Sequence, residues 1–256
     1  MNGRSGGYLV VVGLGPGEAL FLTPQAQEAL EQAEAIYGYM PYLDRVPVRE
    51  GQQRFASDNR EELARAGAAL AHAASGARVA MVSGGDPGVF AMAAAVIEAI
   101  DAGPPEWRAL DLSIVPGITA MLAVAAKTGA PLGHDFCAIS LSDNLKPFEL
   151  VEKRLRLAAQ AGFAMAFYNP VSKARPWQLD RAFEVLREEL PGDVPVIFGR
   201  AVGRPDERLR VLPLANARGH MADMATCIIV GSVETRTVER PGLSTLVYTP
   251  RRAGPR

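Results

Sequence analysis

A glycine-rich stretch that follows a short apolar run carries the clearest chemical signal in the sequence. Residues 83–90 (SGGDPGVF) come after the strand-like run 78–83 (RVAMVS) and lead into an alanine-rich, helix-favouring segment, 87–102. Adjacent glycines let a ligand approach the backbone closely, and amides at such a corner favour negative charge. We predict a ligand-binding corner with Pro87 in the first turn of the helix. The alternative is an ordinary tight strand-to-helix turn.

Polar side chains gather in two later loops. The first strand of this region, 136–140, is preceded by His134-Asp135 and followed by residues 141–147 (LSDNLKP), and residues 168–175 (YNPVSKAR) follow the next strand. Carboxylate, imidazole and ammonium groups can move protons, and cationic groups can hold carboxylates. We expect both loops to face one crevice. Helix caps and solvated loops are the alternative explanation.

Two other motifs do not by themselves indicate a ligand. Residues 13–18 (GLGPGE) resemble a dinucleotide fingerprint, but position 18 is Glu instead of the third glycine and Pro16 lacks an amide. No Gly-Lys-Ser/Thr occurs anywhere in the chain, which excludes a P-loop. Residues 36–43 (IYGYMPYL) place three tyrosines in an expected loop, either as a platform for a flat ligand or as a small satellite core.

The elements that must position these residues alternate between strands and helices. Strands end at Gly13, Gly84 and Gly117, and each breaks into a Gly/Pro loop. This order predicts a mostly parallel α/β sheet with its ligand crevice at the carboxyl ends of the strands. Residues 129–133 (GAPLG) form the best linker, so we expect domains at 1–128 and 134–256, the second ending in antiparallel strands.

Composition reduces the number of function classes that the chain could belong to. The 256 residues have a net charge of −1, and no basic run with interleaved aromatics points to nucleic acid. Cys137 and Cys227 lie in apolar runs, which favours buried thiols in a reducing compartment, and no Cys/His cluster indicates a metal. The N-terminal apolar run is too short for a signal peptide or a membrane span, so we expect a cytoplasmic protein.

Four motifs together resemble a known family. VGLGPG at 12–17, SGGDPGVFAMA at 83–93, PGITAMLAVAA at 116–126 and IIVG at 228–231 are similar to the tetrapyrrole methylases that use S-adenosylmethionine. The resemblance covers essentially the whole chain. GAPLGHDFCAISLSDNLKP at 129–147 and FYNPVSKARPWQL at 167–179 resemble the subfamily of precorrin-3B C(17)-methyltransferases of cobalamin biosynthesis.

The resemblance implies two α/β domains with mixed sheets, a cofactor cleft between them, and a homodimer that binds a small tetrapyrrole and neither nucleic acid nor membrane. S-adenosylmethionine would be converted to S-adenosylhomocysteine. From the first domain, the positions that would line the cofactor are Pro16, Gly84, Gly85, Asp86, Val89, Thr119 and Ala120. From the second, they are Tyr168, Asn169, Arg200, Ala201 and Thr226.

The implied reaction is methylation of precorrin-3B at carbon 17, coupled to ring contraction to precorrin-4. Candidate acid–base residues for contraction are His134, Asp143, Asn144 and Lys146, and Lys146, Lys173 and Arg175 are candidate anchors for substrate carboxylates. Alternatives are a methylase of the same fold acting on cobalt-precorrin-3, another precorrin or an RNA ribose, and a nicotinamide-dependent precorrin reductase. Pro16 argues against the reductase.

Overall fold

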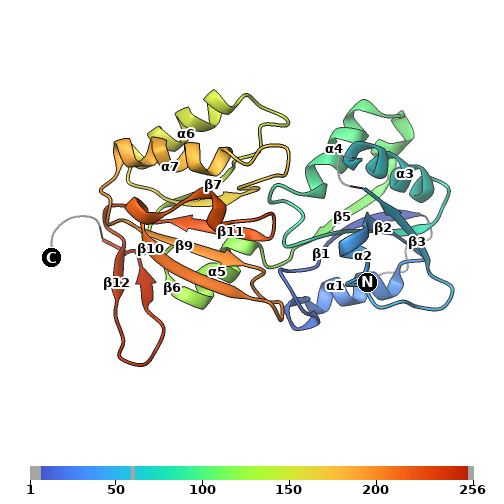
Figure 1. Ribbon diagram of the computed structural model, residues 1–256. Helices are drawn as coiled ribbons and strands as arrows, with labels where there is room; N and C mark the ends of the chain where they lie inside the picture. The colour runs from blue at the N-terminus through green and yellow to red at the C-terminus, as the bar shows by residue number, and fades with distance from the viewer. Residues whose placement is uncertain (1–6, 59–60, 253–256) are drawn as a thin grey trace. The chain divides into compact units, whose positions relative to one another are not determined.

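The chain forms two compact units, Met1–Thr119 and Ala120–Arg256, each built around its own sheet (Figure 1). The structure is a computed structural model that describes residues 7–58 and 61–252. We had expected a boundary near residues 129–133, but the compact units divide nine residues earlier, after Thr119. The reason is packing, because Val124 of helix α5 (Ala120–Thr128) is fully buried among residues of the second unit such as Ile197 and Ile229.

The first unit contains a five-stranded sheet in the order β3-β2-β4-β1-β5, with every pair parallel. Its strands are β1 (Tyr8–Gly13), β2 (Ala35–Tyr39), β3 (Gln53–Ser57), β4 (Arg78–Ser83) and β5 (Asp111–Val115). Since β1 lies between β4 and β5, the glycine loops that follow these three strands are neighbours at the carboxyl edge. This confirms the arrangement expected from the sequence.

Helices cover both faces of this sheet. Helices α1 (Pro24–Gln32) and α2 (Met40–Leu43) lie on one face, where they pack on Val10 and Val12, while α3 (Glu62–Ala74) and α4 (Met92–Ala102) pack on Leu9 and Val11. The alternation along β1 is the period-2 pattern of a strand buried on both sides. Short 3₁₀ turns occupy Ala19–Phe21 and Pro105–Ala109.

Two expectations for this unit were wrong. Helix α4 begins at Met92, so Pro87 belongs to a turn and not to the first helical turn. The tyrosine segment is not a loop at its start, because residues 36–39 belong to β2. Tyr37 is buried there, stacks on Phe55 of β3 with ring centroids 4.5 Å apart, and contacts the Nδ1 atom of His72 through its hydroxyl at 3.2 Å.

The second unit contains a mixed five-stranded sheet in the order β10-β9-β11-β8-β7. Its strands are β7 (Phe136–Ser140), β8 (Ala164–Tyr168), β9 (Pro195–Arg200), β10 (Arg208–Pro213) and β11 (Thr226–Val230). The β7–β8 pair is parallel and the others are antiparallel, as expected for a domain that ends in antiparallel strands. A smaller sheet joins β12 (Arg236–Val238), β13 (Leu246–Tyr248) and β6 (Gly129–Ala130).

Helices α6 (Phe148–Gln160) and α7 (Gln178–Glu189) lie side by side on one face of the mixed sheet, and α5 lies on the other. Met165 and Phe167 face α6 and α7, while Ala166 faces α5. The remaining 3₁₀ turns are Leu214–Asn216 and Gly219–Met221.

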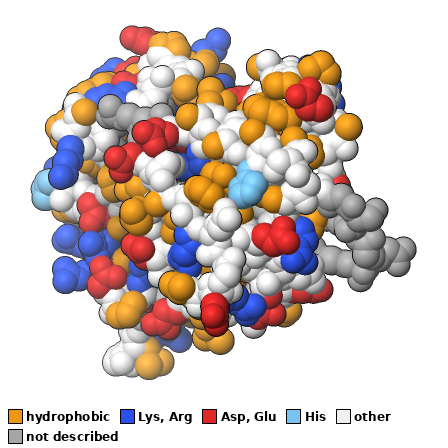
Figure 2. Space-filling model, turned by 90° about the vertical axis from the view of Figure 1, so that its right-hand side faces the viewer, with side chains coloured by type: hydrophobic (Ala, Val, Ile, Leu, Met, Phe, Trp, Pro, Cys, Tyr) orange, Lys and Arg blue, Asp and Glu red, His pale blue; other side chains and the backbone are white. Residues whose placement is uncertain are grey.

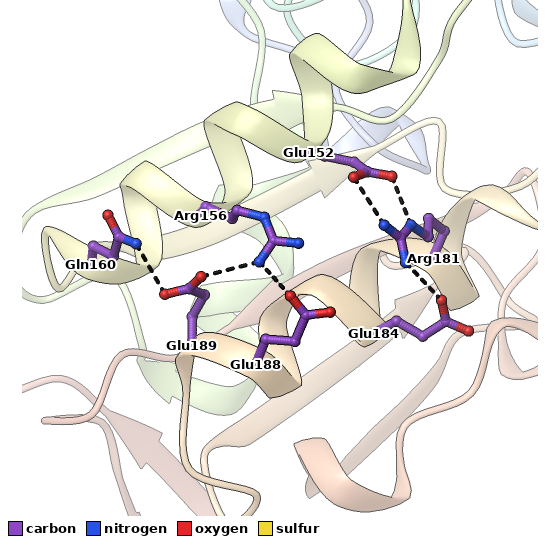
Figure 3. Close-up of polar contacts among 7 residues, drawn as sticks. All are labelled: Glu152, Arg156, Gln160, Arg181, Glu184, Glu188 and Glu189. Atoms are coloured by element: carbon purple, nitrogen blue, oxygen red, sulfur yellow. Dashed lines mark hydrogen bonds and ion pairs between the residues drawn. The ribbon is translucent and has the colours of Figure 1, made fainter.

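An ion-pair network ties α6 to α7 on their outer side (Figure 3). Arg181 donates to both carboxylate oxygens of Glu152, at 2.6 and 3.0 Å, and Arg156 bonds Glu188 and Glu189. Hydrogen bonds from Arg181 lower the pKa of Glu152. These groups lie at the surface and are partly exposed to solvent, so their contribution to stability is small. Their consequence is geometric, since α6 and α7 carry the two polar loops at their N-terminal ends.

The surface agrees with the near-neutral charge of the chain. On the face shown in Figure 2, acidic and basic side chains are interspersed, and hydrophobic side chains occur in several groups among them. Within residues 7–58 and 61–252, no helix is long and apolar enough to cross a membrane. Both cysteines are free, and burial raises the pKa of Cys227 to about 12.

Candidate functional site

Three glycine loops meet at the carboxyl edge of the first sheet. Gly15 and Gly85 exchange two backbone hydrogen bonds, at 3.1 and 2.9 Å. A Cβ atom at Gly117 would lie 2.2 Å from the Gly85 carbonyl oxygen, and one at Gly13 would lie 2.6 Å from the Gly117 nitrogen. Such distances are below any non-bonded contact, so glycine is required for the loops to approach. The corner is therefore a close junction of three backbones.

Asp86 holds this junction together. Its Oδ1 atom accepts from the Gly88 amide at 2.8 Å, and its Oδ2 atom accepts from the Gly117 amide at 3.1 Å. The carboxylate thus joins the loop after β4 to the loop after β5. The same turn ends in Phe90, whose φ of 51° is left-handed and which is half exposed. Backbone strain of this kind often accompanies ligand sites.

Arg45 is a residue of this site that the sequence analysis missed. Its Nη2 atom donates to the carbonyl oxygens of Leu14, Gly15 and Gly17 at 2.8, 2.9 and 2.7 Å. One guanidinium therefore fixes the loop after β1. No local sequence motif predicts this role, because Arg45 lies about 30 residues from the loop that it holds.

The chemistry of the corner decides what it can bind. A pyrophosphate needs free amides and positive charge, yet here Asp86 occupies two amides with a carboxylate and Arg45 is directed at carbonyl oxygens. The corner fits instead a phosphate-free ligand recognised by backbone groups, such as the amino acid and ribose parts of S-adenosylmethionine. Of the other residues expected here, Pro16, Gly84 and Val89 are half-buried and Thr119 is buried.

One edge of the second sheet gathers the remaining cofactor candidates. Strand pairing aligns Ser140 with Tyr168 and Thr226 with Arg200, so the ends of β7, β8 and β9 meet the start of β11 there. The Tyr168 hydroxyl accepts from the Met121 amide at 3.0 Å, near the N-terminal end of α5, which begins with Ala120.

Two of these residues have left-handed backbones. Asn169 has a φ of 51°, and its side-chain Nδ2 atom donates to Ser140 Oγ at 3.0 Å. Ala201 has a φ of 49°. Both directly follow strands at this edge. Arg200 donates to the carboxylates of Asp206 and Asp223, and these hydrogen bonds raise its pKa, the one to Asp206 by more.

The two polar loops start from the same edge, and the structure joins them through Arg175. The Arg175 guanidinium bonds the carboxylate of Asp143 and the side-chain oxygen of Asn144, and Gln178 donates to Asp143 at 2.8 Å. Asp143, Asn144 and Arg175 thus lie together, as expected. In the structure the charge of Arg175, which we expected to anchor a substrate carboxylate, pairs with Asp143.

Lys146 lies in the same loop with a different environment. Its ammonium donates to the Ser142 carbonyl at 2.9 Å. Burial and, secondly, the charge of Arg154 lower the pKa of Lys146, and Asp143 raises it by a smaller amount. Lys173 is exposed on the neighbouring loop, and the Leu145 side chain is 99% exposed. The ammonium proton of Lys146 is therefore held less tightly than that of an ordinary lysine.

The structure does not bring His134 to this cluster. His134 precedes β7 and the polar loop follows it, and five residues at roughly 3.3 Å each separate the two ends by about 16 Å. The imidazole Nδ1 accepts from the Asp135 amide at 2.7 Å, and His134 lines a pocket together with Phe163 and Glu234. The prediction grouped His134 with the polar loop because both flank β7 in the sequence. They lie at opposite ends of that strand.

Comparisons with known proteins agree with the resemblance seen in the motifs. The family described as Tetrapyrrole (Corrin/Porphyrin) Methylases matches residues 8–218. The chain is 67% identical over 245 residues to the precorrin-3B C(17)-methyltransferase of Sinorhizobium sp, a match that covers 96% of each chain.

Solved structures extend the likeness to three dimensions. The methyltransferase CobJ superposes with a TM-score of 0.91 and 54% identity, over 95% of this chain and 100% of that one. A uroporphyrin-III C-methyltransferase from Thermus thermophilus, solved with S-adenosyl homocysteine, superposes with a TM-score of 0.68 over 89% of this chain and 98% of its own. At 22% identity, this last similarity concerns the fold alone.

Proposed function

Because this chain belongs to the family of tetrapyrrole (corrin/porphyrin) methylases, we propose that it methylates precorrin-3B at carbon 17 and contracts the ring to precorrin-4. The observation that carries the proposal is the near full-length similarity to a relative whose name gives the methylation of precorrin-3B at carbon 17. The two polar loops at one edge of the second sheet support it, because they supply an acid–base candidate, Lys146, and an exposed cation, Lys173, for an acidic macrocycle.

We propose a set of cofactor residues in each unit. In the first these are Pro16, Gly84, Gly85, Asp86, Val89 and Thr119, and in the second Ala120, Tyr168, Asn169, Arg200, Ala201 and Thr226. S-adenosylmethionine would supply an electrophilic methyl group. Asp86 would act by holding the Gly88 and Gly117 amides in place, since its carboxylate accepts from both.

Methyl transfer to an electron-rich carbon requires alignment more than proton transfer. Effective molarities of about 10⁵ M or more show that alignment alone can give a large acceleration. The glycine junction and the left-handed Asn169 and Ala201 are suited to such positioning, because close backbone contacts and hydrogen bonds hold them.

Ring contraction is favoured by removal of a proton from the hydroxyl at carbon 20, and a positioned base can add roughly 10²–10⁴-fold. We assign this role to Lys146, whose pKa is lowered. Asp143 and Asn144 would position the loop through Arg175, and Lys173 would hold a substrate carboxylate. His134 is left out because it lies at the other end of β7.

Replacing Asp143 with alanine should impair ring contraction before it weakens binding of the cofactor. The variant loses the partner of Arg175 and Gln178, so the loop that carries Lys146 is released. We expect precorrin-4 formation to fall at least tenfold while the dissociation constant of S-adenosylhomocysteine, measured by calorimetry, stays within twofold. Unchanged precorrin-4 formation would remove Asp143 from the mechanism.

Replacing Lys146 with arginine should separate proton transfer from charge. Arginine keeps the positive charge but stays protonated at all accessible pH values. We expect the KM for precorrin-3B to change little and the contraction rate to fall by about 10²-fold or more. A rate equal to that of the parent protein would mean that residue 146 only holds a carboxylate.

The decisive test is incubation of the purified protein with precorrin-3B and methyl-labelled S-adenosylmethionine, followed by mass and carbon NMR analysis. One added methyl at carbon 17 of a contracted ring supports the proposal. Cofactor binding without turnover would transfer the assignment to cobalt-precorrin-3 or another precorrin. We also propose a cytoplasmic homodimer, for which light scattering on the purified protein is the check of the oligomeric state.

A further inference from the structure

Asp223 organises the edge of the second sheet that carries Arg200, Ala201 and Thr226. One of its oxygens, Oδ2, accepts from Arg200 Nε at 2.8 Å. The other, Oδ1, accepts from Thr226 Oγ1 at 2.8 Å and from the Ala225 amide at 3.0 Å. The Asp223 amide in turn donates to Thr226 Oγ1 at 3.0 Å. A single carboxylate therefore joins the end of β9 to the start of β11.

The contacts of Asp223 continue to the strained backbone of Ala201. The Ala201 amide donates to the Ala225 carbonyl at 2.9 Å, and the Ala225 amide is held by Asp223. An alanine with a φ of 49° is unfavourable and persists only where neighbouring contacts determine its conformation. The Asp223 turn supplies those contacts.

The electrostatics agree with this arrangement. Burial acts to raise the pKa of Asp223, but the hydrogen bonds from Thr226, Arg200 and the Ala225 amide outweigh it and lower the pKa below its usual value. Asp223 is therefore held as a carboxylate whose acceptor oxygens are engaged on three sides.

We propose that Asp223 is a positioning residue that fixes Arg200, Ala201 and Thr226 in the geometry that receives the cofactor. The inference rests on the proposed function, which assigns these three residues to S-adenosylmethionine. Asp223 acts through them: it sets the direction of the Arg200 guanidinium and, through Ala225, the left-handed backbone of Ala201.

Asp206 provides a matched control. Its carboxylate accepts from Nη1 of the same Arg200 at 2.6 Å, and its side chain is exposed. Its bond to Arg200 has no part in the Asp223–Ala225–Ala201 connection. Removing either carboxylate takes one negative charge from Arg200, but only the loss of Asp223 releases the Ala201 turn.

The test is calorimetric titration of the full chain and its variants with S-adenosylhomocysteine. We expect Asp223→Ala to weaken binding at least tenfold and Asp206→Ala to stay within twofold of the parent protein. The affinity of Asp223→Asn should lie between those of the two alanine variants, because its side-chain oxygen can still accept from Thr226 and Ala225 while its side-chain nitrogen faces Arg200. If Asp223→Ala does not fold, the affinity of Asp223→Asn for S-adenosylhomocysteine tests the inference instead. We expect this affinity to be at least threefold lower than that of the parent protein.

Kinetics and melting separate positioning from simple stability. Positioning predicts a raised KM for S-adenosylmethionine and an unchanged KM for precorrin-3B. A lower melting temperature with unchanged affinity in the folded variants would overturn the inference. Equal losses of affinity for S-adenosylhomocysteine in Asp223→Ala and Asp206→Ala would overturn it too. Absence of S-adenosylhomocysteine binding in the parent protein would instead overturn the proposed function.

Discussion

Replacing Gly117 with alanine is expected to weaken cofactor binding strongly. The new Cβ atom would lie 2.2 Å from the Gly85 carbonyl oxygen and 2.9 Å from the Gly13 carbonyl carbon, and both neighbours are backbone. The three loops must therefore separate. We expect affinity for S-adenosylhomocysteine to fall about 100-fold or more, which corresponds to roughly 2.7 kcal/mol, with a loss of folding stability of about 1–3 kcal/mol.

Gly67→Ala is the matched control for this experiment. Gly67 lies inside α3 of the same unit, and a Cβ there would meet only the Trp107 ring at 3.6 Å, an ordinary contact. Alanine in a helix interior should raise stability by up to about 1 kcal/mol. Urea denaturation and calorimetry measure the two effects. Normal affinity in Gly117→Ala would show that the glycine junction is not part of the cofactor site.

Replacing Arg45 with methionine is expected to have the second large effect. Methionine keeps the apolar stem but leaves the carbonyl oxygens of Leu14, Gly15 and Gly17 without their common donor. A hydrogen bond to a charged group contributes about 1.5–3 kcal/mol, and we expect the free energy of unfolding to fall by at least this amount. Affinity for S-adenosylhomocysteine should fall about tenfold, or ~1.4 kcal/mol, because the loop after β1 is released.

Arg49→Met serves as the control. Arg49 lies four residues farther along and makes an exposed ion pair with Glu31 at 2.7 Å, which contributes little to stability. Denaturant titration should distinguish the two variants clearly. A loss of stability in Arg45→Met without any change in affinity would limit Arg45 to a structural role.

Most of the fold follows from local patterns in the sequence. The apolar runs that predict strands at 78–83, 136–140 and 226–230 coincide with β4, β7 and β11. Strands β2 and β3 were missed for different reasons. Tyr and Gly made residues 36–39 look like a loop, and β3 is an edge strand whose residues are largely exposed, so it lacks a clear hydrophobic period.

The sequence by itself determined the glycine corner, because backbone close approach requires glycine whatever its partners are. Only the tertiary structure decided the partners. Asp86 holds an amide 31 residues away, Arg175 reaches Asp143 across 32 residues, and Arg45 fixes a loop about 30 residues earlier. Hydrogen bonds over such separations depend on strand order and side-chain direction, which leave no periodic trace. For the same reason, His134 and Asp143 are close in sequence yet lie at opposite ends of one strand.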